Sequence, residues 1–134
     1  MTTYVDSSML LKRYVEEPDS DVAVALLNGD PVLVTSWISL VETRRNLARL
    51  LGGSVLDAAR RQLVRDLDGM ALVAVDEETC NTAARIAEDL GVRSLDAIHL
   101  ASAQRLLIPA IAFITFDRRQ AQAARSLGFT VLGA

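Results

Sequence analysis

The sequence predicts an α/β fold, a three-layer α/β/α sandwich built on a mainly parallel five-stranded sheet. Short apolar runs rich in β-branched residues alternate with longer helical segments along the whole chain. Capping residues and glycines mark the ends of most helical segments. Because parallel strands are joined by crossover helices, this alternation favours a sheet that is covered by helices on both faces.

The strand segments are short and rich in Val, Ile, Phe, Tyr or Thr, as β-strands usually are. Strands are expected at residues 2–5, 31–35, 71–75, 111–116 and 129–132. The helical segments between them are longer and mostly begin after a Ser or Asp. Helices are expected at residues 9–15, 21–27, 37–51, 55–67, 77–90, 95–107 and 118–127.

Side-chain oxygens before these helices can accept hydrogen bonds from the free N–H groups of the first turn. The expected capping residues are Asp19 or Ser20, Ser36, Ser54, Asp76, Ser94 and Asp117. Pro18 prevents the first helix from continuing. Glycines after the later helices provide stop signals, and the helices at 37–51 and 55–67 form a hairpin across Gly52-Gly53.

Composition bounds the kind of protein that this chain can be. A length of 134 residues, 51% of them hydrophobic and 23% charged, is typical of a globular chain with one core. We therefore expect one domain over residues 1–134. A net charge of -3 gives no general attraction to nucleic acid, so RNA binding would depend on a local basic patch or a metal ion.

Cysteine and histidine usage narrows the chemistry and the location. A single cysteine excludes an internal disulfide and is consistent with a reducing cytosol. We see neither a signal peptide nor an apolar run of about 20 residues, so we expect a cytoplasmic protein outside the membrane. One His and one Cys exclude the usual zinc sites. A bound metal would therefore be Mg²⁺ or Mn²⁺ held by carboxylates.

Two acidic residues follow strands directly. Asp6 comes after the first strand and Asp117 after the fourth, and each precedes a helix. Ligands of open α/β sheets bind at the carboxyl ends of the strands, so we expect a shared acidic site there. The alternative is that both aspartates serve only as helix N-caps.

Two further acids lie on helices. Asp96 is in the first turn of a helix rich in small residues, which allow close packing on the sheet; it could instead only complement the helix dipole. Glu42 projects from the flank of its helix, where an ion pair with Arg45 is the alternative. For His99, one turn after Asp96, a structural role is favoured over metal binding.

These acids and their neighbours resemble a known family. The segments Asp6-Ser7-Ser8, Leu95-Asp96-Ala97-Ile98-His99-Leu100-Ala101 and Thr115-Phe116-Asp117, with Glu42 in a helix, resemble PIN domains. Within that family the chain is most similar to the VapC-type toxins of bacterial toxin–antitoxin pairs. The resemblance implies the strand order 3-2-1-4-5 and a metal-dependent ribonuclease. It also implies that Asp6, Glu42, Asp96 and Asp117 are the catalytic, metal-binding set, with Thr115 lining the site.

Clustered carboxylates repel one another, and Mg²⁺ or Mn²⁺ would relieve that repulsion and activate a water molecule against the phosphodiester. Arg93, Arg118 and Arg119 adjoin the acids and are expected to bind RNA phosphates; the alternative is a solvated surface. Because only 4% of the residues are aromatic, we expect recognition of RNA shape or of a particular loop rather than base stacking along a single strand. The expected substrate is a structured RNA, tRNA or rRNA.

The resemblance also implies partners, namely a second copy of the chain in a homodimer and a cognate VapB-type antitoxin. Two alternatives remain within the family: a housekeeping nuclease of RNA processing and a silent module that binds RNA or protein. Two other classes are disfavoured. A phospho-receiver domain needs an acidic pair and a late lysine, but Ser7-Ser8 follow Asp6 and no lysine follows Lys12. A phosphatase would need an aspartate at Ser8.

Overall fold

The computed structural model of the chain describes residues 2–29 and 32–134. Its strands are β1 (Thr2–Val5), β2 (Val32–Ser36), β3 (Ala71–Val73), β4 (Ala112–Thr115) and β5 (Thr130–Gly133). Its helices are α1 (Ser7–Leu11), α2 (Ser20–Asn28), α3 (Ile38–Leu50), α4 (Gly53–Asp68), α5 (Glu77–Leu90), α6 (Ser94–Gln104) and α7 (Arg118–Ser126).

The five strands form one sheet in the order β3-β2-β1-β4-β5, and every pairing is parallel. This confirms the predicted fold class and the strand order that the resemblance implied. The central strand β1 pairs with β2 and β4, so Tyr4 lies beside Val34 on one side and Phe113 on the other. The chain reverses its direction of winding between β1 and β4, which is where open sheets form their ligand crevice.

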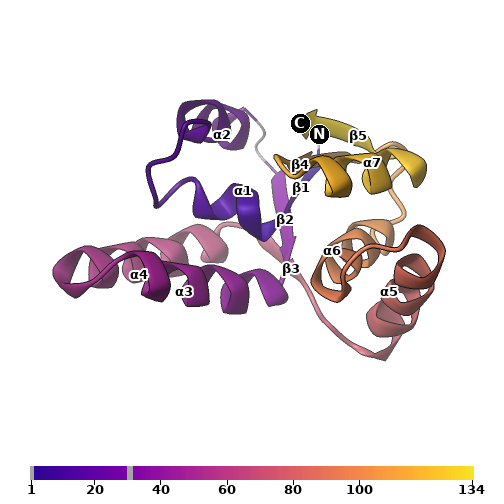
Figure 1. The fold of residues 1–134 in the computed structure, drawn as a ribbon, viewed down its shortest axis with the longest axis horizontal. Coiled ribbons are helices and arrows are strands. Elements are labelled where there is room, and N and C mark those ends of the chain that lie inside the picture. Colours follow the sequence, from indigo (N-terminus) through magenta and orange to yellow (C-terminus); the bar gives the residue numbers. More distant parts are fainter. Residues whose placement is uncertain (1, 30–31) are drawn as a thin grey trace.

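Helices cover both faces of this sheet. Figure 1 shows α1 to α4 on one side of the strands and α5 to α7 on the other. Side chains alternate along each strand, so Tyr4 and Phe113 enter the core under α5 to α7, whereas Val5 and Ile114 enter the core under α1 to α4. The acids that follow β1 and β4 therefore lie at the edge where both layers meet.

Several helix boundaries differ from the prediction. Asp76 and Asp117 cap α5 and α7 as expected. Ser54 and Ser94 were wrong as capping residues, because both lie inside the first turn and the residues before their helices, Gly52 and Arg93, make no side-chain cap bond. Gly53 has a positive φ of 57° and makes the tight turn into α4, so that helix starts earlier.

The remaining differences are at strand and helix ends. Asp6 caps α1, which begins at Ser7 and is shorter than the predicted helix at 9–15. The helix α6 ends at Gln104 because Leu107 leaves the helical region with a positive φ of 54°. The predicted start of the second strand at residue 31 lies outside the described residues.

Within residues 2–29 and 32–134, none of the helices combines the length and the apolar character that a membrane-spanning helix requires.

Candidate active site

Asp6 is buried at the carboxyl end of β1, with only 4% of its surface exposed. Its Oδ1 atom accepts hydrogen bonds from the main-chain N–H of Met9 at 3.0 Å and from the Ser8 hydroxyl at 2.8 Å. Burial raises the pKa of Asp6, against the opposing effects of the nearby His99 and of the Thr115 hydroxyl. The surrounding groups therefore do not fully offset the cost of burying the ionised carboxylate, and a cation beside it would stabilise it.

Asp117 lies at the end of the neighbouring strand. Its Oδ1 atom accepts hydrogen bonds from the main-chain N–H groups of Arg119 at 2.8 Å and Gln120 at 3.1 Å, at the start of α7. Its own N–H donates to the buried hydroxyl of Thr115 at 3.1 Å. The same hydroxyl favours the ionised form of Asp6, so Thr115 lies close to both aspartates. Asp6 and Asp117 both cap helices, the simpler role considered for them from the sequence, and both make their cap bonds through Oδ1 alone.

Glu42 reaches the same region from α3. Its Oε1 atom lies 2.7 Å from Nε2 of His99 on α6, so the structure gives it a partner other than Arg45. The Nδ1 atom of His99 lies 2.8 Å from the hydroxyl of Tyr4 on β1. The prediction that His99 bonds to nearby side chains is confirmed, and one of its two partners is itself a candidate catalytic residue.

Asp96 lies at the start of α6, beside an arginine. The Nε atom of Arg93 is 3.2 Å from Oδ2 of Asp96, and its Nη2 atom is 3.7 Å from Oδ2 of Asp117. The side-chain amide of Gln120 donates to the main-chain carbonyl of Asp96 at 3.1 Å, which ties α7 to α6. A positive group thus already lies between two of the four acids, although Arg93 is 76% exposed and these ion pairs are correspondingly weak.

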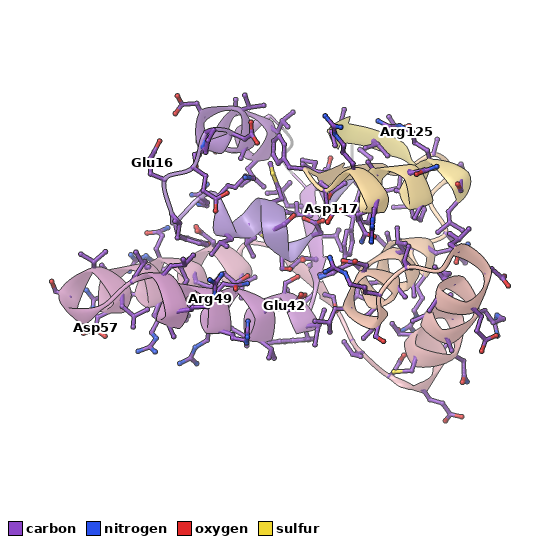
Figure 2. The ribbon with its side chains drawn as sticks, viewed as in Figure 1. Glu16, Glu42, Arg49, Asp57, Asp117 and Arg125 are labelled. Carbon is purple, nitrogen blue, oxygen red and sulfur yellow. The ribbon has the colours of Figure 1, made fainter. Side chains whose placement is uncertain are left out.

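The donor chemistry suits an oxygen-liganded divalent cation. Figure 2 shows Glu42 and Asp117 near the middle of the view, whereas Glu16, Asp57 and Arg125 lie toward its edges. As the side chains stand, no three His, Cys, Asp or Glu residues among those described form a group that could hold an ion. The guanidinium of Arg93 between Asp96 and Asp117 nevertheless shows that positive charge is accommodated beside these two acids, and carboxylate oxygens are the ligands that Mg²⁺ prefers.

A cleft of about 440 Å³ opens beside Asp96, between α7 and the segment that joins α5 to α6. Arg93 and Arg119 line it, whereas Arg118 is exposed at the start of α7 and does not. Gln122 and Ser126 also line it, and sequence reasoning missed both. Their positions three and seven residues after Arg119 place them on one helix face, a periodicity that could have identified them.

Comparisons with known proteins agree with this arrangement. The PIN domain family profile matches residues 3–126. Ribonuclease VapC46 of Mycobacterium tuberculosis strain H37Rv is 36% identical over 129 residues, which cover 96% of this chain and 95% of that protein.

Solved structures give the same result for the fold. The M. tuberculosis toxin VapC20, described as cleaving the sarcin-ricin loop, has a TM-score of 0.72 and 21% identity over 98% of each chain. A toxin-antitoxin complex from Klebsiella pneumoniae has a chain with a TM-score of 0.71 and 15% identity, covering 97% of this chain and 95% of that chain. At these identities the solved structures show a shared fold.

Proposed function

Because the chain belongs to the PIN domain family and groups with its VapC members, we propose that it is a metal-dependent endoribonuclease and the toxin of a VapBC-type pair. The observation that carries the proposal is the placement of four acids at one sheet edge. Asp6 and Asp117 follow adjacent strands and Thr115 lies close to both, while Glu42 and Asp96 come from helices of opposite layers.

In this proposal Asp6, Glu42, Asp96 and Asp117 hold Mg²⁺ or Mn²⁺. When bound, the ion would supply the positive charge that makes a water molecule nucleophilic and stabilises the phosphodiester as its charge develops. Asp6 and Asp117 keep fixed orientations because their Oδ1 atoms are held by main-chain N–H groups. Cleavage of the bond to the 3′ oxygen would leave a 5′ phosphate.

Substrate binding would use the cleft beside Asp96. Arg93 and Arg119 line it, and guanidinium groups bind phosphate oxygens through paired hydrogen bonds. Arg118, exposed at the start of α7, would contact the RNA backbone outside the cleft. We infer that the substrate is a structured RNA, tRNA or rRNA, a choice supported by the similar fold of VapC20, a toxin that cleaves the sarcin-ricin loop.

We also infer a cognate VapB-type antitoxin that inserts an arginine among the acids. The toxin-antitoxin complex from K. pneumoniae supports a partner of this kind. The position of Arg93 between Asp96 and Asp117 supports the site's ability to accept a guanidinium. We further infer that residues 1–134 act as one domain, as a homodimer in the cytoplasm.

The test is cleavage of a pool of tRNA and rRNA by the purified protein with Mg²⁺ or Mn²⁺, with chelator, and with Asp96→Asn. We expect chelator to abolish cleavage and Asp96→Asn to reduce its rate by roughly 100-fold or more, since each metal ligand contributes several kcal/mol to the transition state. The matched control is Asp57→Asn, at an exposed position on α4. It should cleave at the wild-type rate.

Two results would contradict the proposal. Cleavage that persists in Asp96→Asn would come from a contaminant or from another site. If the protein binds Mn²⁺ but cleaves no RNA, the nuclease proposal is contradicted and the alternative is a silent module that binds RNA or protein.

A further inference from the structure

The single histidine of the chain lies between the central strand and a candidate metal ligand. His99 is 2% exposed, and each of its ring nitrogens has a side-chain partner. The Tyr4 hydroxyl is 2.8 Å from Nδ1, and Oε1 of Glu42 is 2.7 Å from Nε2. Tyr4 is fully buried, and its ring stacks on Phe113 at a centroid distance of 5.2 Å. Two hydrogen bonds thus connect Tyr4, His99 and Glu42 in series, from the sheet to the site.

Hydrogen-bond chemistry fixes which atom donates and which accepts in each of these two bonds. An ionised Glu42 can only accept, so Nε2 of His99 carries the proton that is donated to it. In the neutral imidazole Nδ1 is then an acceptor, and the Tyr4 hydroxyl donates to it. A tyrosine hydroxyl is ordinarily protonated at neutral pH and can therefore donate to Nδ1. Tyr4 therefore selects the tautomer with which His99 bonds to Glu42.

Glu42 needs such support more than the other acids do. Main-chain N–H groups hold Asp6 and Asp117 as N-caps, and Asp96 has a shorter side chain at a helix start. Glu42 lies inside α3, where the N–H groups are already used in helical hydrogen bonds, and its side chain has one more rotatable bond than aspartate. The hydrogen-bond partner that the structure gives its carboxylate is a side chain from another element, His99 on α6.

We propose that Tyr4 and His99 are positioning residues that hold the Glu42 carboxylate in the orientation that binds the divalent cation. The inference rests on the proposed metal-dependent function and adds two residues to it. Partners that orient metal ligands through a second hydrogen bond typically change metal affinity about 10- to 100-fold when they are removed.

The first measurement is the tautomer of His99 by ¹⁵N nuclear magnetic resonance, on protein without a polyhistidine tag. Because the chain has one histidine, its two ring nitrogens give the only imidazole signals. At a pH at which the ring is neutral, we expect a protonated Nε2 and an unprotonated Nδ1 in the wild type. In Tyr4→Phe that preference should weaken, because Nδ1 loses its donor. A wild-type ring that is protonated at Nδ1 and not at Nε2 would overturn the proposal.

The second measurement is the Mn²⁺ affinity by titration calorimetry, with thermal unfolding to establish that each variant is folded. We expect Tyr4→Phe to weaken Mn²⁺ binding about tenfold. The matched control is Tyr14→Phe, which removes the hydroxyl that donates to Asp66 at 2.6 Å on α4. It should change Mn²⁺ affinity by less than about twofold, well below the effect of losing an orienting partner.

Variants of His99 give a rescue test. The amide nitrogen of His99→Gln can replace Nε2 as a donor to Glu42, whereas His99→Leu has no donor. We expect His99→Gln to retain more Mn²⁺ affinity than His99→Leu. If His99→Leu does not fold, Tyr4→Phe and His99→Gln still provide the comparison.

The outcomes separate this inference from the nuclease proposal. If the wild type cleaves RNA and Tyr4→Phe binds Mn²⁺ with unchanged affinity, the positioning role is overturned and the nuclease proposal stands. Mn²⁺ binding that depends on Tyr4, without cleavage of any RNA, would overturn the nuclease and leave the positioning role. A wild type that does not bind Mn²⁺ would overturn both.

Discussion

Asp6 combines two roles that oppose each other in the metal-free protein. Its Oδ1 atom caps α1, which stabilises the fold. Burial of the same carboxylate raises its pKa, so its ionised form destabilises the fold at neutral pH. Residues at functional sites often carry such a cost, which a bound ligand then relieves.

Asp6→Asn should therefore stabilise the metal-free protein at neutral pH. A raised native pKa means that the protonated form contributes stability below the unfolded pKa, and that this contribution is lost as the pH rises through the native value. The amide stays neutral and can still accept the cap bond from Met9. We expect a higher midpoint of thermal unfolding in chelator at pH 8, by roughly 4 °C for each kcal/mol gained.

The advantage of Asp6→Asn should shrink as the pH falls toward 4, where the wild-type carboxylate becomes neutral. With saturating Mn²⁺ the order should reverse, because only the wild type gains stability from the bound ion. A variant that is less stable than the wild type in chelator at pH 8 would show that burial of the charge is not the dominant effect.

At the scale of elements, the strand pair β4–β5 holds Thr115 beneath the two aspartates. Gly133 pairs with Thr115 in the parallel register and has a φ of 102°. A Cβ atom at this glycine would lie 2.6 Å from the Thr115 carbonyl oxygen, which is too close for any side chain. Gly128 also has a positive φ, of 87°, but a Cβ atom there would meet open space.

Alanine at these two glycines should separate backbone strain from steric contact. We expect Gly128→Ala to lower the free energy of unfolding by about 1 kcal/mol, the usual cost of a left-handed conformation for a side-chain-bearing residue. Gly133→Ala should cost roughly 2 kcal/mol or more, because overpacking adds to that strain. Urea denaturation measures both. Equal losses in the two variants would mean that β5 moves away from Thr115 without resistance.

At the scale of the whole molecule, the candidate site depends on both helical layers. Glu42 comes from α3 in one layer, Asp96 lies on α6 and Asp117 caps α7 in the other, and Asp6 lies at the sheet between them. Helix α6 reaches across to α3 through the bond between His99 and Glu42. Both layers must therefore pack on the sheet before the four acids can share one region.

The outer surface carries apolar residues that one molecule leaves uncovered. Trp37 and Val41 lie one turn apart at the start of α3 and are 50% and 61% exposed. Large exposed apolar side chains of this kind mark interaction surfaces. We expect the protein to sediment as a homodimer, at twice its chain mass of 14.5 kDa.

The double variant Trp37→Glu/Val41→Glu should shift the protein to monomers, because a charge buried in an apolar interface without a partner is strongly unfavourable. Val64→Glu on α4, where Val64 is 55% exposed, is the matched control and should remain dimeric. Analytical ultracentrifugation distinguishes the two masses. A double variant that stays dimeric would place the interface elsewhere on the surface.

The sequence alone determined the features that depend on neighbours along the chain. The alternation of strands and helices predicted the layered sheet, and an aspartate directly before a helix predicted the caps at Asp76 and Asp117. Strand order was available only through the family resemblance, since local patterns do not specify which strands pair. Ser54 and Ser94 were wrong as capping residues because either of two adjacent residues can start a helix, and turn geometry decides between them.

Only the tertiary structure decided which side chains meet. The partners of His99 lie 57 and 95 residues away in sequence, and no local periodicity connects them. The position of Arg93 between Asp96 and Asp117 likewise depends on how α6 and α7 pack against the sheet. Short-range patterns set the elements, whereas the site arises from contacts that exist only after the layers have packed.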